Sequence, residues 1–130
     1  MNALSVARLR TMSIALSAWS ALLGACGEQR DYRPQVRGGD AQRGQIALLR
    51  HDCGVCHAIP GIIGAHGRVG PSLASYGRFP HLAGKFPNDP ELLVRWLTDA
   101  PSMAVATAMP ALDLDEQEAR DMAAYLYSLE

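Results

Sequence analysis

The segment Cys53-Gly54-Val55-Cys56-His57 carries the most specific signal in this chain of 130 residues. Two residues separate the thiols, so both can point the same way from the end of a helix, and an imidazole follows directly. This pattern is typical of covalent haem attachment, in which the thiols add across two vinyl groups and the histidine ligates the iron. We therefore expect one haem c, bound through Cys53 and Cys56, with His57 as an axial ligand.

Three other uses of a Cys-x-x-Cys pair compete with this interpretation. A thioredoxin-like redox pair follows a strand in a βαβ unit, whereas the residues before Cys53 predict a capped helix. Structural zinc would need two further ligands from among His51, His57, His66 and His81, whose spacing matches no zinc finger or ribbon. A disulfide across two residues would be strained. Haem attachment is favoured over all three.

Two helices are predicted on either side of the motif. Asp40 is placed to cap a helix over residues 41–52, which leads into the cysteines. Asn88 or Asp89 is placed to cap a second helix over residues 90–100, with a proline in its first turn and another directly after its end. Both segments repeat apolar residues at helical spacing, so each has one face suited to a core.

The last helix and the loops complete an all-α fold. Asp113 with Glu116 three residues on is a capping-box pattern, and the helix it opens runs to Leu129. Residues 58–88 hold glycine or proline at ten positions, which precludes a long helix or a regular sheet there. So small a domain with so much loop has a poor apolar core of its own. We expect three main helices and glycine- and proline-rich loops around one covalent haem.

Residues 1–25 have the layout of an export signal. They hold Arg8 and Arg10 but no acidic residue, and then run apolar over residues 12–23. That run is shorter than the roughly 20 residues that a membrane-spanning helix needs. We expect the segment to be removed, so that the mature protein lies on the periplasmic side of a bacterial membrane.

The segment Leu23-Gly24-Ala25-Cys26 resembles the lipobox of bacterial lipoproteins. The resemblance implies that Cys26 is acylated and becomes the mature N-terminus, anchored to the membrane; an ordinary cleavage site is the alternative. The polar residues 26–39 then form a linker with two glycines at its end, and residues 40–130 form the folded domain.

Charge limits the class of partner. The chain has a formal net charge of −1, and loss of the two arginines in the export segment leaves about −3. Nothing in this balance attracts nucleic acid. Lys85 is the single lysine, which excludes a docking face built from a ring of lysines. Electrostatic steering towards a redox partner must come from arginines or from acidic groups.

Several further motifs make residues 40–130 resemble the class I cytochromes c, above all the bacterial modules that serve terminal oxidases. The motifs are Gly-Pro-Ser-Leu at 70–73, Tyr-Gly-Arg at 76–78, Trp96, Ala-Met-Pro at 108–110 and the ending Ala-Ala-Tyr-Leu-Tyr-Ser-Leu at 123–129. The resemblance also implies that the first and last helices cross at a contact between a glycine and an aromatic ring. Gly44 and Tyr125 are the residues that would meet there.

The same resemblance implies how the protein holds its haem. The carbonyl of Pro71 would accept a hydrogen bond from His57 and so orient the imidazole towards the iron. Leu73 would lie against the haem face. Arg78 and Trp96 would donate hydrogen bonds to the propionates.

The sixth iron ligand is expected to be Met109. A proline follows it and forces an extended backbone, which can direct the side chain at a metal, and the position matches the Met-Pro of the family. Met103 is the next candidate, whereas Met122 has the position of a core residue on a helix. His66 or His81 would give a bis-histidine alternative.

Axial ligation by His57 and Met109 leaves the iron no open position for a substrate, so we expect an electron carrier and not an enzyme. It would move single electrons between membrane respiratory complexes, from a quinol-oxidising complex towards a terminal oxidase. The alternatives are a haem c subunit or module of an oxidase or dehydrogenase complex, and a gas-binding haem sensor.

Overall fold

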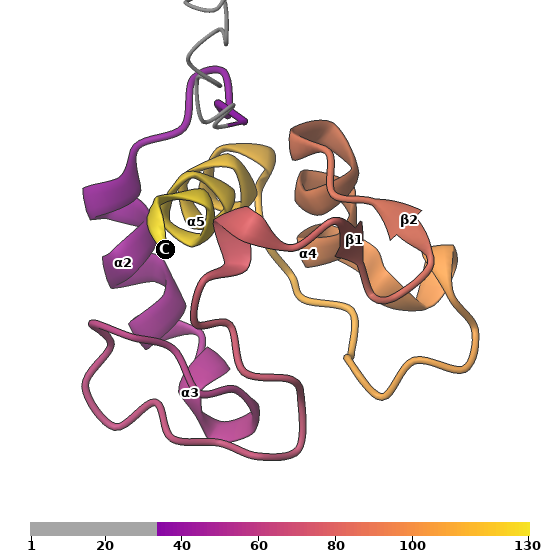
Figure 1. Cartoon of the computed structure of the whole chain (residues 1–130), viewed down its shortest axis with the longest axis horizontal. Helices are drawn as coiled ribbons and strands as arrows, with labels where there is room; N and C mark the ends of the chain where they lie inside the picture. Colours follow the sequence, from indigo (N-terminus) through magenta and orange to yellow (C-terminus); the bar gives the residue numbers. More distant parts are fainter. Residues whose placement is uncertain (1–33) are drawn as a thin grey trace, which may run out of the picture. The chain divides into compact units, whose positions relative to one another are not determined.

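The computed structural model describes residues 34–130. The predicted export signal, the predicted acylation site Cys26 and most of the predicted linker lie outside these residues. The described part is mostly helical, as predicted, and Figure 1 shows how its elements follow one another. They are α2 (Ala41–Arg50), α3 (Cys53–Cys56), the 3-10 turn η1 (Tyr76–Arg78), β1 (His81–Leu82), β2 (Phe86–Pro87), α4 (Pro90–Met103) and α5 (Glu116–Ser128). None of the helices in this range is long and apolar enough to cross a membrane.

The helices α2 and α5 cross in close contact at Gly44. A Cβ atom at this position would collide with the carbonyl oxygen of Asp121, so the absence of a side chain lets the two backbones touch. The prediction that Gly44 meets Tyr125 is wrong. The Tyr125 hydroxyl lies beside Gly61 and donates a 2.7 Å hydrogen bond to the carbonyl of Pro60. Tyr125 therefore fastens the loop after the cysteine motif to α5.

The core lies where α2, α4 and α5 meet, and each helix contributes its apolar stripe. The most deeply buried side chains are Leu48, Leu93, Met122 and Leu126. Met122 is completely buried, as its position on α5 predicts for a core residue.

Helix α4 begins and ends for identifiable reasons. Asp89, and not Asn88, is its cap, because the Asp89 carboxylate accepts hydrogen bonds from the first backbone N–H groups of the helix. Asn88 instead donates to the carbonyls of Tyr76 and Phe79, which ties the end of η1 to the start of α4. Asp99 leaves the helical conformation just before the proline that was expected to end the helix, and one further turn follows this break.

The predicted start of α5 at Asp113 is wrong. The cap is Asp115, whose carboxylate accepts a 2.7 Å hydrogen bond from the backbone N–H of Glu118. The spacing of an acid three residues before a glutamate occurs twice here, at 113 and at 115. Leu114 is buried, and it occupies the position before the cap, where an apolar residue fixes the entry of the chain into a helix. Burial of Leu114 therefore selects the second of the two caps.

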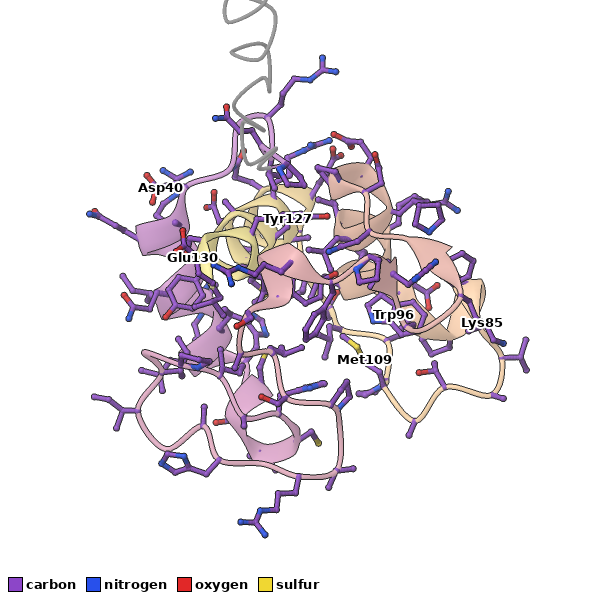
Figure 2. All side chains as sticks on the ribbon, in the orientation of Figure 1. Asp40, Lys85, Trp96, Met109, Tyr127 and Glu130 are labelled. Atoms are coloured by element: carbon purple, nitrogen blue, oxygen red, sulfur yellow. The ribbon has the colours of Figure 1, made fainter. Side chains whose placement is uncertain are left out.

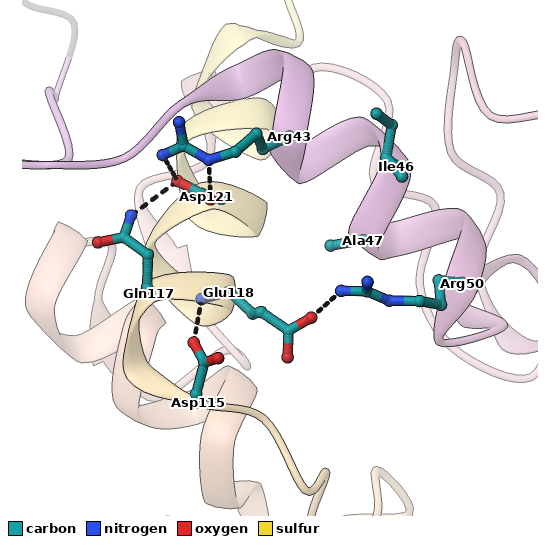
Figure 3. A pocket seen from close by; sticks show the side chains of 8 residues that line it. All are labelled: Arg43, Ile46, Ala47, Arg50, Asp115, Gln117, Glu118 and Asp121. Carbon is teal, nitrogen blue, oxygen red and sulfur yellow. Dashed lines mark hydrogen bonds and ion pairs between the residues drawn. The ribbon is translucent and has the colours of Figure 1, made fainter.

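A buried carboxylate locks α2 onto α5, as Figure 3 shows. Asp121 is 4% exposed and accepts hydrogen bonds from Arg43 Nε at 2.7 Å, from the backbone N–H of Asp40 at 2.8 Å and from Gln117 at 2.9 Å. Burial alone raises the pKa of Asp121, but the donors outweigh it, so the pKa lies below its usual value. The folded state therefore favours the ionised carboxylate.

Replacing Asp121 by asparagine is expected to lower the free energy of unfolding at pH 7 by about 2 kcal/mol, because charged acceptors make the stronger hydrogen bonds. The folded-state pKa is depressed, so this stabilisation is present above the unfolded pKa of about 3.9 and is lost as the pH falls through the folded value. Denaturant titrations at pH 7 and near pH 3 check this. Glu116→Gln, on an exposed side chain of the same helix, is the control. An equal loss at both pH values would contradict the account.

Part of the segment predicted as a linker packs against the domain. Val36 packs against the core, and Gln117 of α5 donates a 2.7 Å hydrogen bond to the carbonyl of Gly38. Gly39 lies so close to α5 that a side chain there would collide with the carbonyl oxygen of Arg120. The last residues of the predicted linker thus lie along α5.

Candidate functional site

The two thiols of the motif lie on a single helical turn, α3, and the imidazole follows directly after it. Asp52 has a left-handed backbone (φ 53°), which separates the end of α2 from α3 and allows α3 to begin at Cys53. Cys53 and Cys56 occupy the first and last positions of this turn and are not joined in a disulfide. His57 returns to an extended backbone, which carries its ring away from the turn.

The ring of His57 is held from two sides. Its Nδ1 lies 2.7 Å from the carbonyl oxygen of Pro71, which is the contact that the resemblance to the class I cytochromes c implies. A side chain on Gly70 would collide with the ring, so glycine here lets the loop backbone pass directly beside it. When Nδ1–H donates to this carbonyl, Nε2 is the nitrogen that carries a free electron pair, and it is the ring atom suited to bind a metal.

A cavity of about 540 Å³ adjoins this histidine, with walls that are predominantly apolar. The structure brings together around it seven of the eight predicted haem-contact residues, namely Cys53, Cys56, His57, Pro71, Leu73, Trp96 and Met109. Figure 2 labels Trp96 on α4 and Met109 on the loop between α4 and α5. Arg78 is not among the lining residues; it is exposed on η1. The prediction that Arg78 contacts the haem therefore has no support from the cavity wall.

Comparison with known proteins assigns the chain to a family. The family model described as cytochrome c matches residues 41–130. This chain belongs to the cytochrome c family. It is also 32% identical over 90 residues to cytochrome c oxidase subunit 2 of Alkalihalophilus pseudofirmus, a match that covers 68% of this chain. The match covers 25% of that relative, so the chain corresponds to about a quarter of its length.

Membership of this family implies a covalently bound haem c, and the residues that line the cavity fit one. Two thiols at the spacing of the attachment motif, an oriented imidazole and a thioether share one apolar cavity. Tyr76 also lines it, 4% exposed, and its hydroxyl has no hydrogen-bond partner. A buried hydroxyl without a partner is costly, so a polar group on a bound molecule would be favourable there.

The cavity wall separates the candidates for the sixth ligand of the cytochrome. Met109 lines the cavity, whereas Met103 packs against the core and Met122 lies fully within it. Of the two histidines in the bis-histidine alternative, His81 on β1 lines the cavity and His66 does not. Of the predicted candidates for the sixth ligand, only Met109 and His81 line the cavity.

The competing uses of the cysteine pair find no support. Burial raises the pKa of the Cys53 thiol to about 11, whereas a redox-active pair needs a lowered thiol pKa. Within residues 34–130 no group of three or more histidine, cysteine or acidic side chains is placed to hold a metal ion. The strand that would precede a thioredoxin-like motif is replaced by α2.

Sequence reasoning missed three parts of this wall. His51 was considered as a zinc ligand and not as part of the haem site, yet it lines the cavity. Its Nε2 is buried and lies 3.5 Å from a carboxylate oxygen of Glu118. Tyr76 was noted only as part of a motif. The turn of the β1–β2 hairpin, Ala83 and Gly84, also borders the cavity, and both residues have positive φ angles. A glycine after an apolar pair was the one local signal for this turn.

Proposed function

We propose that this cytochrome carries single electrons with an iron held between His57 and Met109, and that it delivers them to a terminal oxidase. One observation carries the proposal: the oriented imidazole and the Met109 side chain border the same cavity as both attachment thiols. Membership of an electron-transfer family supports the general activity. The axial ligands and the direction of electron flow are the proposed part.

The residues around the cavity have separable roles in this proposal. Cys53 and Cys56 would hold the haem covalently, and His57 would present Nε2 to the iron because Pro71 fixes its ring. When bound, the haem supplies a reversible one-electron couple between ferric and ferrous iron. The thioether of Met109 is a soft donor that favours the ferrous state, and apolar walls keep water away from the iron. Both effects raise the reduction potential.

The proposed partners follow from the relative and from the predicted anchor. The match to an oxidase subunit favours service to a terminal oxidase, either as a shuttle from a quinol-oxidising complex or as a component of a larger complex. Acylation of Cys26 would hold the protein on the periplasmic side of the membrane, in keeping with the extracytoplasmic location of bacterial c-type cytochromes. A tether of this kind raises the effective concentration at a membrane enzyme.

The test is to mature the full chain in a bacterium that attaches haem c, and to examine the purified protein by pyridine haemochrome assay and mass spectrometry. We expect one haem bound through two thioether bonds, an acylated Cys26, a charge-transfer band from sulfur to ferric iron, and no binding of carbon monoxide by the reduced protein. A colourless product would overturn the proposal. Ready binding of carbon monoxide would favour a gas sensor or a haem enzyme instead.

A further inference from the structure

We propose that Asp99 is a positioning residue for Met109: its side chain fixes the break in α4 that closes the loop on which Met109 lies. The inference rests on the proposed function, because it concerns how the chain holds the proposed sixth ligand. The loop consists of residues 100–110, called here the Met109 loop, and Figure 1 shows the chain returning through it from α4 towards α5. It supplies four residues of the cavity wall: Thr107, Ala108, Met109 and Pro110.

The break in α4 has a cause in the sequence. Asp99 has an extended backbone, with φ −150° and ψ 76°, inside a segment that is otherwise helical. A proline in the interior of a helix lacks the N–H donor, and its ring collides with the carbonyl four residues earlier, so Pro101 prevents an unbroken helix. Proline is tolerated in a first turn, and a new turn over residues 100–103 begins directly after the break. Asp99 therefore separates two helical segments.

The Asp99 side chain makes the hydrogen bond of a helix cap. Its Oδ1 atom accepts a 3.2 Å bond from the backbone N–H of Ser102, three residues along, which is the pattern of an N-cap. The Ser102 hydroxyl in turn donates a 2.8 Å bond to the carbonyl of Asp99. These two bonds hold Asp99 in its extended conformation. Proline breaks the helix, and the Asp99 carboxylate fixes the conformation of the backbone at the break.

The extended backbone at Asp99 pairs with the far end of the Met109 loop. Asp99 forms an antiparallel bridge with Ala111, and the N–H of Leu112 donates a 3.2 Å bond to the carbonyl of Thr98. A helical residue at position 99 would direct its backbone groups along the helix axis, where they could not form this bridge. The two contacts join the ends of the loop, and the bridge lies two residues after Met109. The break thus fixes the path of the chain at Met109.

The middle of the loop is held less firmly than its ends. Val105 is 96% exposed, so its side chain adds little packing. The bonds here are local: the N–H of Thr107 donates to the carbonyl of Ala104 at 2.9 Å, and the N–H of Met109 donates to the Thr107 hydroxyl at 3.2 Å. Such bonds shape the loop without attaching it to the domain. Attachment comes from the packing of side chains near its two ends and from the closure at the break.

Asp99 acts on the iron site only through the loop. Neither Asp99 nor Ser102 lines the cavity, so replacing either side chain removes no contact with the haem directly. The thioether of Met109 is a soft donor that binds ferric iron less well than ferrous iron. A loop that opens more readily should therefore be detected first in the ferric protein, as easier replacement of Met109 by a foreign ligand.

The first experiment titrates the ferric holoprotein with imidazole and records the concentration that removes half of the charge-transfer band. A foreign ligand binds in proportion to the fraction of protein in which the sixth position is open. Asp99→Ala should lower this half-point roughly fivefold, which is the size of effect that loss of one helix cap produces. Asp99→Asn keeps an oxygen acceptor for the N–H of Ser102 and should restore most of the wild-type value.

The matched control removes the cap at the other end of the same helix. Asp89 accepts hydrogen bonds from the first N–H groups of α4 and does not line the cavity. Asp89→Ala should lower the Tm by about as much as Asp99→Ala, because both remove one cap, and should leave the imidazole half-point unchanged. Equal shifts of the half-point in both variants would indicate a general loss of stability and would overturn the assignment of Asp99.

The second experiment measures loop closure without reference to the iron ligand. Amide hydrogen exchange of the holoprotein reports the N–H of Leu112, which bonds to the carbonyl of Thr98. Asp99→Ala should speed this exchange severalfold, and Asp89→Ala should not. A wild-type protein without the charge-transfer band would count against the proposed function alone, because exchange at Leu112 still decides whether Asp99 closes the loop.

Two results would contradict the role of Asp99. One is an Asp99→Ala protein whose half-point and Leu112 exchange both equal those of the wild type. The other is an Asp99→Asn protein as easily opened as Asp99→Ala, which would exclude the cap as the cause. If Asp99→Ala does not mature, Ser102→Ala replaces it, because it removes only the bond from the Ser102 hydroxyl. It should lower the half-point by a smaller factor, and an unchanged half-point there would equally overturn the proposal.

Discussion

Replacing Met109 by alanine is expected to open the sixth coordination position of the iron. The charge-transfer band from sulfur to ferric iron should disappear, the ferrous protein should bind carbon monoxide, and the reduction potential should fall by on the order of 0.1 V or more. The physical reason is that the thioether stabilises ferrous iron and Met109 is the only methionine of the described residues on the cavity wall. Absorption spectroscopy and potentiometric titration measure all three effects.

Met103→Ala is the matched control. Met103 ends α4, five residues before Ala108, but it packs against the core. It should keep the band and the potential. His81 also lines the cavity, so Met109→Ala that stays low-spin would indicate that His81 has taken the empty position. The double variant Met109→Ala/His81→Ala decides this. A wild-type band that survives Met109→Ala would exclude Met109 as the ligand.

The parts of the site that lie close together in sequence could be predicted well. The segment from Cys53 to His57 is local, since five successive residues place both thiols and the imidazole together, although Pro71 fixes the orientation of the ring. The cap at Asp40 was also predictable, and the cap of α4 was narrowed to Asn88 or Asp89, because a cap bonds to residues two or three positions along. Where two identical local patterns competed, as at Asp113 and Asp115, only burial of Leu114 decided between them.

Pro71, Leu73, Trp96 and Met109 were expected at the haem only through the resemblance to a family, and other parts that depend on contacts distant in sequence were missed. Tyr76 gains its place on the cavity wall by packing edge-on against Phe79 and Tyr127. His81 reaches the wall because a three-residue turn pairs β1 with β2. The motif around Arg78 suggested a haem contact, but Arg78 is not among the residues that line the cavity, so this contact stays a prediction. A motif states which residue types occur together, and the fold decides which of them face the cavity.

Replacing Gly44 by alanine is expected to destabilise the protein by about 3 kcal/mol, although helix propensity alone predicts a gain of about 1 kcal/mol. The added Cβ would collide with the carbonyl oxygen of Asp121, and that atom belongs to the backbone of α5 and cannot turn aside. The two helices must separate, which also strains the bonds from Arg43 to Asp121. Thermal unfolding of the holoprotein, followed by far-ultraviolet circular dichroism, should show a Tm lower by roughly 15 °C.

The sign of this change is the informative quantity, because the two physical effects oppose each other. Ile46→Ala serves as the control on the same helix: its side chain is 64% exposed, so the change should stay within about 0.5 kcal/mol. If Gly44→Ala proves more stable than wild type, α2 and α5 do not touch at this point. If instead it is destabilised while the charge-transfer band remains, the helix crossing acts on stability and leaves iron ligation to the loops. That separation is expected, because neither Gly44 nor Asp121 lines the haem cavity.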